Sequence, residues 1–463
     1  GPTSLAVSDN FKKRFESYGW NYILINGHNY NEIFKALKKV QNSKKPTVIS
    51  CKTKIGYGSP NKSGKASSHG SPLGKDEIEL VRKKLRWKYK PFVIPKNILN
   101  QWNIIGNKGS KIQTKWNKIY SRKKNKIDKL FKNNFNKAIK SEKKNALNEI
   151  KSFATRKCSE LILNAITYEN KNLIGGSADL AGSNNTKTKF HKIIKSNDFN
   201  GNYIHYGVRE HAMCGIMNGL ALHSKLIPYG GTFLIFSDYC KPSIRLSALM
   251  NLQVIYVMTH DSIGLGEDGP THQPIEQLSG LRSIPNLNVF RPADRIETIE
   301  CWELALKNLK TPSILSLTRQ NLNPVRNKYF TNNKCALGAY EVLRTNKKIN
   351  LTILASGSEV NLAIETSHKL AKNKIYSKVI SVPCLEIFES QSILYKKKIL
   401  DETKLKISIE AGSTDCWKKY VGNEGFAFGV DKFGKSAPYK DIYKYFGLTK
   451  ENISKKIKNL LKN

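Results

Sequence analysis

The chain has 463 residues, too many for one compact core, so typical domain sizes predict about three structural units. Apolar residues make up 39% of the chain, which excludes a largely disordered protein, and no apolar run approaches the roughly 20 residues that span a bilayer. The net charge of +42 would ordinarily favour nucleic-acid binding, but the lysines occur throughout and lack the interleaved aromatic residues that stack on bases. We therefore predict neither a nucleic-acid partner nor a membrane partner.

The eight cysteines and the first residues indicate where the protein works. The cysteines are scattered singly, without a CxxC pair or metal-ligand spacing, which favours a reducing, cytoplasmic compartment. The sequence begins GPTSLAV, with no Met and no signal-peptide core. We expect that its natural beginning, with any organelle-targeting segment, is missing.

Strand and helix patterns alternate in the first hundred residues. Apolar runs at 22–26 and 47–52 predict strands, and amphipathic helices follow at 33–40 and 78–85. This βαβα order is typical of a parallel sheet covered by helices. The stretch 55–73 is rich in Gly and Ser and is expected to be a loop.

A polar, lysine-dense segment at 114–151 is predicted to be a connector with some helix. The α/β pattern resumes at Phe153, with strands at 254–258 and 313–317 and a long helix at 296–306 between them.

A third unit is expected to begin near Ala336. A strand runs into a helix at 351–360, and further strands are predicted at 378–382 and 405–409.

Three segments of the middle region combine glycine with acidic, histidine or aromatic residues after predicted strands. They are GGSADLAGSN at 175–184, YGVREHAM at 206–213 and THDSIGLGEDGPTHQP at 259–274. The ends of parallel strands are where α/β proteins place ligands. Taken singly, a Gly-rich loop is often only a turn, and a lone histidine is more often structural than catalytic.

Taken together and in this order, the three segments closely resemble the pyrimidine-binding domain of transketolases. Further matching strings are ESYGWNYILINGHN at 16–29, KTKIGYGSPNKSGKASSHGSPLG at 52–74, ATRK at 154–157, YGGTFLIFSDY at 229–239, RPAD at 291–294, TRQNL at 318–322 and GVDKFGKSAP at 429–438. The resemblance covers nearly the whole chain and fails mainly in the connector.

The resemblance implies three α/β domains with parallel-type sheets, in the fold of thiamine-diphosphate-dependent transketolases. The rear half of the diphosphate-binding domain is expected at 1–120, a Lys/Asn-rich connector at 121–150, the pyrimidine-binding domain at 151–333 and the C-terminal domain at 334–463.

The same resemblance implies a thiamine diphosphate site. Glu210 would face N1′ of the aminopyrimidine, where a carboxylate favours the tautomer that takes up the thiazolium proton. From position alone, the preferred interpretation of Glu210 is a helix-start glutamate that complements the dipole. An aromatic wall around the pyrimidine, a nearby carboxylate and a proton-shuttling histidine would be supplied by Phe233, Phe236, Tyr239, Asp179 and His69.

Substrate contacts are implied in the same way. The family's phosphate contacts match Arg156, Ser183, His260 and Arg319. A guanidinium fork suits a phosphate better than an ammonium does, although a single arginine in so basic a chain is by default a surface charge. Asp268 matches the reader of the donor's C2 hydroxyl, and His272 matches a neighbouring site residue. With Glu210 and His69, His260 would also take part in catalysis.

Some family features are absent from the sequence or altered in it. The Gly-Asp-Gly motif and its downstream Asn, which bind Mg²⁺ (or Ca²⁺) and the diphosphate, do not occur, so no metal ligand is assigned in this chain. The ligands are expected in the missing N-terminal part. TRQNLNP carries an extra Asn323, and Pro242 stands where a small helical residue is expected.

The implied activity is reversible transfer of a two-carbon ketol unit in the non-oxidative pentose phosphate pathway. The donor would be a ketose phosphate such as xylulose 5-phosphate, and the acceptor an aldose phosphate such as ribose 5-phosphate or erythrose 4-phosphate. A homodimer with active sites at the subunit interface is implied.

Other functions stay open. Dihydroxyacetone synthase is very close, and deoxyxylulose-phosphate synthase and other two-domain thiamine enzymes share the fold. A basic binding protein would need aromatic residues among its lysines. A non-catalytic relative would be expected to have lost Glu210 or the aromatic wall.

Overall fold

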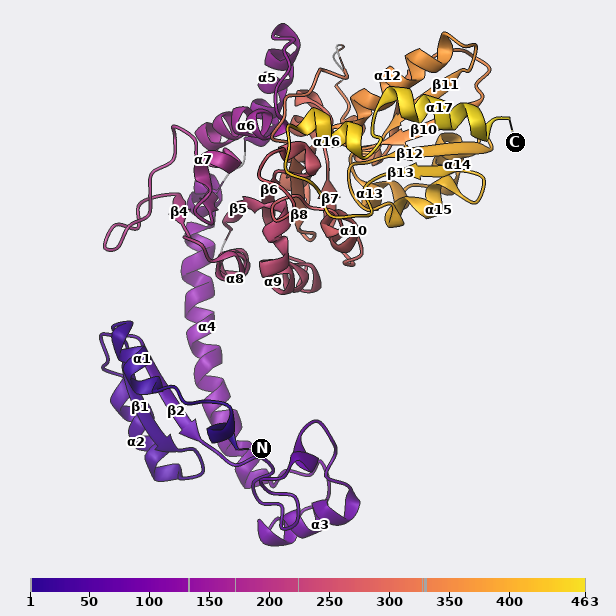
Figure 1. The fold of residues 1–463 in the computed structure, drawn as a ribbon. Helices are drawn as coiled ribbons and strands as arrows, with labels where there is room; N and C mark the ends of the chain where they lie inside the picture. The colour runs from indigo at the N-terminus through magenta and orange to yellow at the C-terminus, as the bar shows by residue number, and fades with distance from the viewer. Residues whose placement is uncertain are drawn as a thin grey trace. The chain divides into compact units, whose positions relative to one another are not determined.

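The computed structural model describes residues 2–131, 134–170, 172–223, 225–326, 328 and 331–462. The chain divides after Arg122 into two compact units, each of which is described by itself (Figure 1). In the first unit, strand β1 (Asn21–Asn26) pairs in parallel with β2 (Thr47–Lys52). The helices are α1 (Phe11–Ser17), α2 (Tyr30–Val40), α3 (Lys75–Lys84) and α4 (Lys96–Leu130). The strands and helices predicted in this region are confirmed.

The lysine-dense segment contains more helix than its composition indicated. Helix α4 continues to Leu130, and α5 (Phe135–Asn148) follows. Phe135, Ala138 and Ile139 of α5 are buried in the core of the second unit. Lys143 of the same helix is also buried, and its Nζ lies 3.0 Å from a carboxylate oxygen of Glu300. Apolar residues at helical spacing therefore give this stretch a core face that the many lysines obscure.

Within the described part of the second unit, six strands form one parallel sheet in the order β4-β3-β5-β6-β8-β7. The strands are β3 (Leu173–Ser177), β4 (Tyr203–His205), β5 (Ile227–Phe233), β6 (Ile255–Thr259), β7 (Asn288–Phe290) and β8 (Ser313–Leu317). The strands predicted at 254–258 and 313–317 are confirmed as β6 and β8.

Helices cover both faces of this sheet. Successive strand residues point to opposite faces, so alternate residues of β6 belong to different cores. Ile255 and Val257 of β6 belong to the core beneath α5, α6 (Thr155–Glu169) and α11 (Arg295–Lys307). Tyr256 and Met258 belong to the core beneath α8 (Glu210–His223), α9 (Ser237–Leu249) and α10 (Gln277–Arg282). The short helix α7 (Ala181–Asn184) follows β3.

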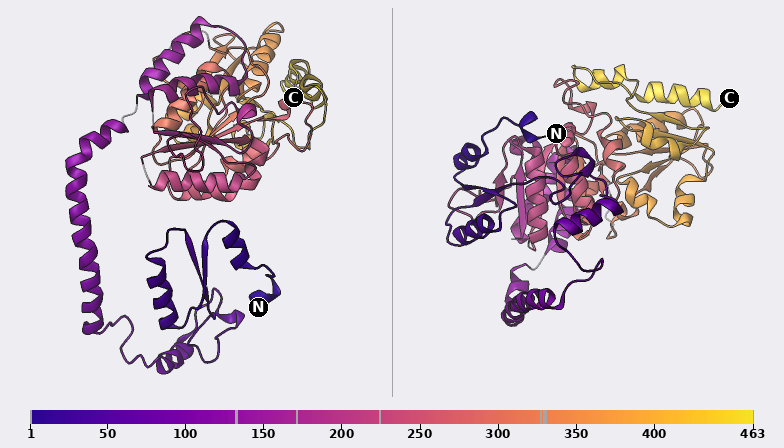
Figure 2. Two further views of the ribbon diagram at one scale, coloured as in Figure 1. Left: turned by 90° about the vertical axis from the view of Figure 1, so that its left-hand side faces the viewer. Right: turned by 90° about the horizontal axis from the view of Figure 1, so that it is seen from below.

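The C-terminal part adds a second sheet, which lies beside the first (Figure 2). Its strands among the described residues run in the order β13-β12-β10-β11-β9, and only β9 is antiparallel to its neighbour. They are β9 (Tyr340–Arg344), β10 (Leu351–Ala355), β11 (Ser377–Ser381), β12 (Leu405–Ile409) and β13 (Phe426–Phe428). Its helices are α12 (Glu359–Ala371), α13 (Leu385–Glu389), α14 (Ile393–Leu400), α15 (Lys418–Val421), α16 (Tyr439–Tyr445) and α17 (Lys450–Leu460).

A buried ion cluster joins the two sheets. Arg291, which follows β7, is fully buried, and its guanidinium lies 2.9 Å from Asp261, 2.5 Å from Glu359 and 3.6 Å from Glu410. Burial by itself lowers the pKa of Arg291, but the carboxylates of Glu359, Asp261 and Glu410 raise it above the ordinary value. Burial raises the pKa of Glu410, but Arg282, Arg291 and a hydrogen bond from Ser356 lower it to about 2.

We predict that Glu359→Gln lowers the free energy of unfolding by about 3 kcal/mol, since removing one partner leaves part of a buried charge uncompensated. Urea unfolding followed by tryptophan fluorescence measures the change. Glu451→Gln is the matched control, because its ion pair with Lys369 is exposed and contributes little. Equal stability of Glu359→Gln and the wild type would contradict a structural role for the cluster.

Candidate active site

Most of the predicted site residues follow the carboxyl ends of neighbouring parallel strands. Asp179 follows β3, Phe233 ends β5, His260 follows β6 and Arg319 follows β8. These four strands are adjacent in the sheet, so their ends meet at one edge. Two of the residues, Asp179 (φ 62°) and His260 (φ 63°), have left-handed backbone conformations. Such conformations cost free energy and cluster at functional sites.

Three aromatic residues form a ladder that leads out of this edge. The rings of Phe233 and Phe236 stack with centroids 5.7 Å apart, and those of Phe236 and Tyr239 lie 5.8 Å apart. Phe233 is buried, Phe236 is half-buried and Tyr239 is 66% exposed. A core stripe would bury all three rings. The ladder is therefore a surface onto which a flat ring can pack.

His260 lies against the inner end of the ladder. It is 3% exposed, and its ring centroid lies 3.9 Å from that of Phe233. Its Nδ1 lies 2.8 Å from the hydroxyl of Thr259. Burial, and then the nearby groups of Arg156, Arg319 and His272, lower the pKa of His260 to about 3. The ring is therefore neutral at physiological pH.

Arg156 and Arg319 place two guanidinium groups near His260. Arg156 Nη1 donates a hydrogen bond to the backbone oxygen of Ser183 at 2.7 Å, and Arg319 donates to that of Leu265. Burial, and then the charge of Arg319, lower the pKa of Arg156. No carboxylate among the described residues forms an ion pair with Arg156, and Arg319 has only Glu267, at 3.7 Å. Two such cations side by side favour a bound dianion.

Glu210 begins helix α8 and is 8% exposed. No described residue donates a hydrogen bond to its carboxylate. One turn later, Cys214 packs against Cys240 of α9, whose thiol donates to the backbone oxygen of Phe236. Glu210 therefore begins a helix that packs on α9, the helix that carries Tyr239 of the ladder.

The other predicted site residues have fewer contacts with His260, the two arginines and the aromatic ladder. His272 is half-buried, and its ring lies 5.6 Å from that of Phe236 and 6.2 Å from that of Phe233. Asp268 and Asp179 are exposed. His69 is exposed in the first unit, directly after a turn at Ala66–Ser68.

The two glycines of GGSADL are explained by packing. A Cβ on Gly175 would lie 2.3 Å from the ring of Tyr229, and one on Gly176 would lie 2.2 Å from the ring of Tyr206. Both glycines therefore make room for tyrosines, Tyr229 on β5 and Tyr206 directly after β4, and their presence alone is no sign of a ligand.

Sequence reasoning missed a buried hydrogen-bond network beneath the site. Asn184 Nδ2 donates to Thr259 Oγ1 at 2.7 Å and to the backbone oxygen of Thr232 at 3.1 Å. Ser177 Oγ donates to Asn184 Oδ1 at 3.1 Å. The only sequence signal was that Asn184 and Thr259 border the segments AGSN and THDS.

The two departures from the family pattern have different outcomes. The side-chain oxygen of Asn323 accepts a hydrogen bond from Ser152 Oγ at 2.6 Å, and its backbone oxygen accepts one from Asn361, so the loop accommodates the extra residue. Pro242 lies inside α9, where it removes the N–H that would bond to the backbone oxygen of Asp238. Nothing in the structure explains this proline.

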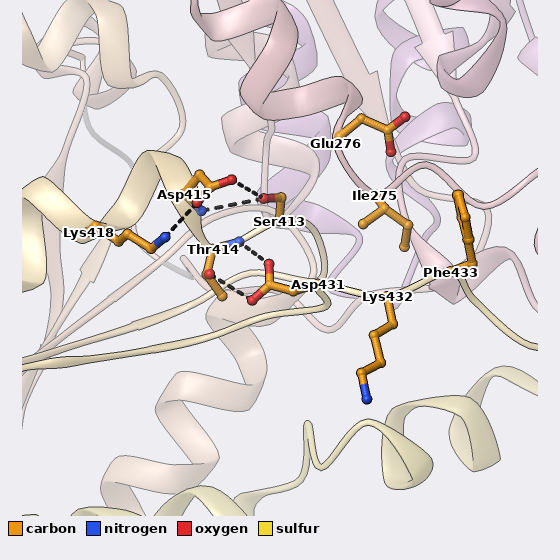
Figure 3. Close-up of a pocket in the computed structure, with 9 residues that line it drawn as sticks. All are labelled: Ile275, Glu276, Ser413, Thr414, Asp415, Lys418, Asp431, Lys432 and Phe433. Carbon is orange, nitrogen blue, oxygen red and sulfur yellow. Dashed lines mark hydrogen bonds and ion pairs between the residues drawn. The ribbon is translucent and has the colours of Figure 1, made fainter.

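A cavity of about 690 Å³ lies apart from the predicted residues (Figure 3). It is lined by Ile275, Glu276, Ser413, Thr414, Asp415, Lys418, Asp431, Lys432 and Phe433. Four of its polar residues pair with one another, since Thr414 bonds to Asp431 and Asp415 lies 2.7 Å from Lys418. None of the predicted site residues lines this cavity.

The described residues form neither a metal-ligand cluster nor a membrane-spanning helix. They contain no cluster of three or more His, Cys, Asp or Glu side chains that could hold a metal ion. None of their helices combines the length and the apolar character needed to cross a bilayer.

Comparisons with known proteins cover nearly the whole chain. Family models match for the transketolase thiamine diphosphate binding domain at residues 1–143, the transketolase pyrimidine binding domain at 151–325 and the transketolase-like C-terminal domain at 338–449. The transketolase of Sinorhizobium medicae is 42% identical over 469 residues, which cover 100% of this chain and 67% of that protein.

Solved structures agree. A Campylobacter jejuni transketolase is 36% identical with a TM-score of 0.88, over 99% of this chain and 70% of that one. A Pichia stipitis transketolase in complex with sedoheptulose 7-phosphate is 35% identical with a TM-score of 0.89, over the same shares. The comparisons give no support to the expectation that part of the diphosphate-binding domain, with its metal ligands, is missing.

We predict that His260 stays neutral between pH 8 and pH 5. Its folded pKa of about 3 lies below the roughly 6.5 of an unfolded histidine. Between pH 3 and pH 6.5 the folded state therefore binds fewer protons than the unfolded state. The contribution of His260 to the free energy of unfolding is complete above pH 6.5 and declines as the pH falls toward 3. NMR titration of ¹⁵N-histidine-labelled protein tests this, with His260→Gln to assign the signal. A titration midpoint near 6.5 would contradict the prediction.

Proposed function

The chain belongs to the transketolase family, and from this premise we propose that it transfers a two-carbon ketol unit from a ketose phosphate to an aldose phosphate. The donor would be a sugar such as xylulose 5-phosphate, and the acceptor ribose 5-phosphate or erythrose 4-phosphate. The observation that carries the assignment of the site is the meeting of His260, two guanidinium groups and an open aromatic ladder at one sheet edge.

Thiamine diphosphate is the cofactor of this family, and it supplies the carbanion chemistry that breaks and forms the carbon–carbon bond. The residues present fit its pyrimidine ring. Phe233, Phe236 and Tyr239 would pack against the ring, and the buried Glu210 carboxylate would accept a hydrogen bond from N1′, which gives it the donor it lacks. Asp179, exposed beside the same strand ends, would line the site.

A divalent ion, Mg²⁺ or Ca²⁺, is the usual partner of a bound diphosphate. The described residues offer no cluster of ligands for such an ion.

The substrate phosphate would bind between Arg156, Arg319 and His260. A dianion there relieves the repulsion between two guanidinium groups that have no strong carboxylate partner. Ser183 lies beside this phosphate position, since its backbone oxygen accepts a hydrogen bond from Arg156.

The remaining assignments follow the family resemblance. Asp268, exposed on the loop after β6, would read the donor's C2 hydroxyl, and the half-buried His272 would contact the sugar beside the ladder. His69 would move protons between diphosphate and substrate. In catalysis it would act with Glu210 and His260.

A homodimer would complete the site. Helices α8 and α9 pack together, and they carry exposed apolar side chains at Ile216, Leu222, Leu246 and Leu249, with Tyr239 at the outer end of the ladder. An apolar face of this kind on a folded chain usually marks an interface, and a second copy would bury it next to Glu210 and the ladder. A monomer at micromolar concentration in analytical ultracentrifugation would contradict this proposal.

We predict that Arg319→Ala raises the Michaelis constant for xylulose 5-phosphate and barely changes that for hydroxypyruvate, a donor without a phosphate. A group that contacts only the phosphate cannot penalise a substrate that has none. Other lysines will not compensate, because salt at 0.15 M screens exposed charges beyond about 8 Å. Arg344→Ala, which removes a guanidinium from the C-terminal sheet, is the control. Equal losses on both donors would mean that Arg319 supports the structure of the site.

We predict that Glu210→Ala lowers turnover by roughly 10²–10⁴-fold, the usual contribution of a positioned acid–base group, with a smaller effect on cofactor affinity. Glu210→Gln keeps the shape of the side chain and should lose a similar factor. Deuterium exchange at the cofactor's thiazolium C2 measures the step directly. An exchange rate equal to that of the wild type in both variants would remove the assigned role.

A further inference from the structure

A continuous line of buried hydrogen bonds ends on the ring of His260. Asn184, Thr259 and Ser177 are all fully buried. Asn184 Nδ2 lies 2.7 Å from Thr259 Oγ1, which lies 2.8 Å from His260 Nδ1. Ser177 Oγ lies 3.1 Å from Asn184 Oδ1 at the other end of the line.

The direction of each bond follows from what its neighbours can do. The second hydrogen of Asn184 Nδ2 goes to the backbone oxygen of Thr232, which can only accept, so the amide orientation is fixed. The Thr259 hydroxyl therefore accepts from Asn184. Its own hydrogen needs an acceptor because the group is buried, and His260 Nδ1 is the only one that the described residues provide.

We infer that Asn184 and Thr259 are positioning residues that hold His260 in the tautomer with hydrogen on Nε2. Nδ1, which accepts from Thr259, is then unprotonated. No described residue bonds to Nε2, which points away from Thr259. The ring thus offers a free N–H donor at the sheet edge where Arg156 and Arg319 lie.

This arrangement suits a phosphate, whose oxygens are acceptors only. The opposite tautomer would direct the lone pair of Nε2 at those oxygens and repel them. An imidazolium would donate as well, but burial and the cations of Arg156 and Arg319, with His272 nearby, keep the ring neutral. The use of the Nε2–H rests on the proposed phosphate site, whereas the tautomer itself follows from the hydrogen bonds alone.

The first test is made on the unaltered protein with thiamine diphosphate bound. Selective ¹⁵N-histidine labelling distinguishes a protonated ring nitrogen from an unprotonated one, and His260→Gln assigns the signals. We expect protonated Nε2 and unprotonated Nδ1 at pH 7.5. A proton on Nδ1 would overturn the inference, and this result does not depend on the folding of any variant.

The second test removes the donor. Thr259→Val keeps the shape of the side chain and should release the tautomer, so the Michaelis constant for xylulose 5-phosphate should rise roughly 10-fold or more, the effect of losing a hydrogen bond to a charged group. The constant for hydroxypyruvate should change little. Thr259→Ser keeps the hydroxyl and should restore both the tautomer and the kinetics.

Equal losses on both donors in Thr259→Val would overturn the positioning role, since a merely structural change does not select by phosphate. The Arg319→Ala comparison tests the phosphate site and leaves the hydrogen bonds among Asn184, Thr259 and His260 intact. A wrong assignment of the phosphate site can therefore be distinguished from a wrong assignment of the positioning role.

Discussion

The buried guanidinium of Arg291 is the constraint on which the rest of the second unit depends. Moving such a cation out of water costs several kcal/mol unless carboxylates surround it. Asp261 comes from the first sheet, whereas Glu359 and Glu410 come from the second, so the charge is compensated only when the two sheets are joined. The C-terminal part, which carries no predicted site residue, thus supplies two of the three carboxylates of this cluster.

The ion cluster is linked to the candidate active site by one peptide bond, between His260 and Asp261. Asp261 directly follows His260, whose backbone is held in a left-handed conformation. Arg291 holds the side chain of Asp261, while Asn184 and Thr259 hold the ring of His260. The position of the ring is therefore set by side chains that touch no substrate, which is how sites are held to the tolerance that catalysis requires.

Much of the fold was predictable because it follows local patterns. Apolar runs marked β1, β2, β6 and β8, and the segments after them marked the edge where the site residues meet. The partners of Arg291 were not predictable from local pattern, because Glu359 and Glu410 lie 68 and more residues away in the sequence.

Other features escaped for reasons of composition. Helix α5 was hidden because its few apolar residues are outnumbered by lysine and asparagine, so a polar average concealed a core face. The order of Asn184, Thr259 and His260 along one line of hydrogen bonds depends on the ends of β3 and β6, which come together only in the folded sheet. The glycines of GGSADL are an opposite case. They look like part of a ligand-binding motif, but the packing of two tyrosines explains them.

The pairing of Arg156 with Arg319 has a consequence for the empty protein. Like charges held close together destabilise the state that contains them, and Glu267, 3.7 Å from Arg319, compensates only one of the two, so a bound anion relieves part of this repulsion. Any phosphate or sulfate in solution that enters this place binds the folded state alone and shifts the folding equilibrium toward it by mass action. The choice of buffer will therefore alter the apparent melting temperature of this protein, and heat resistance measured in phosphate will overstate that of the free chain.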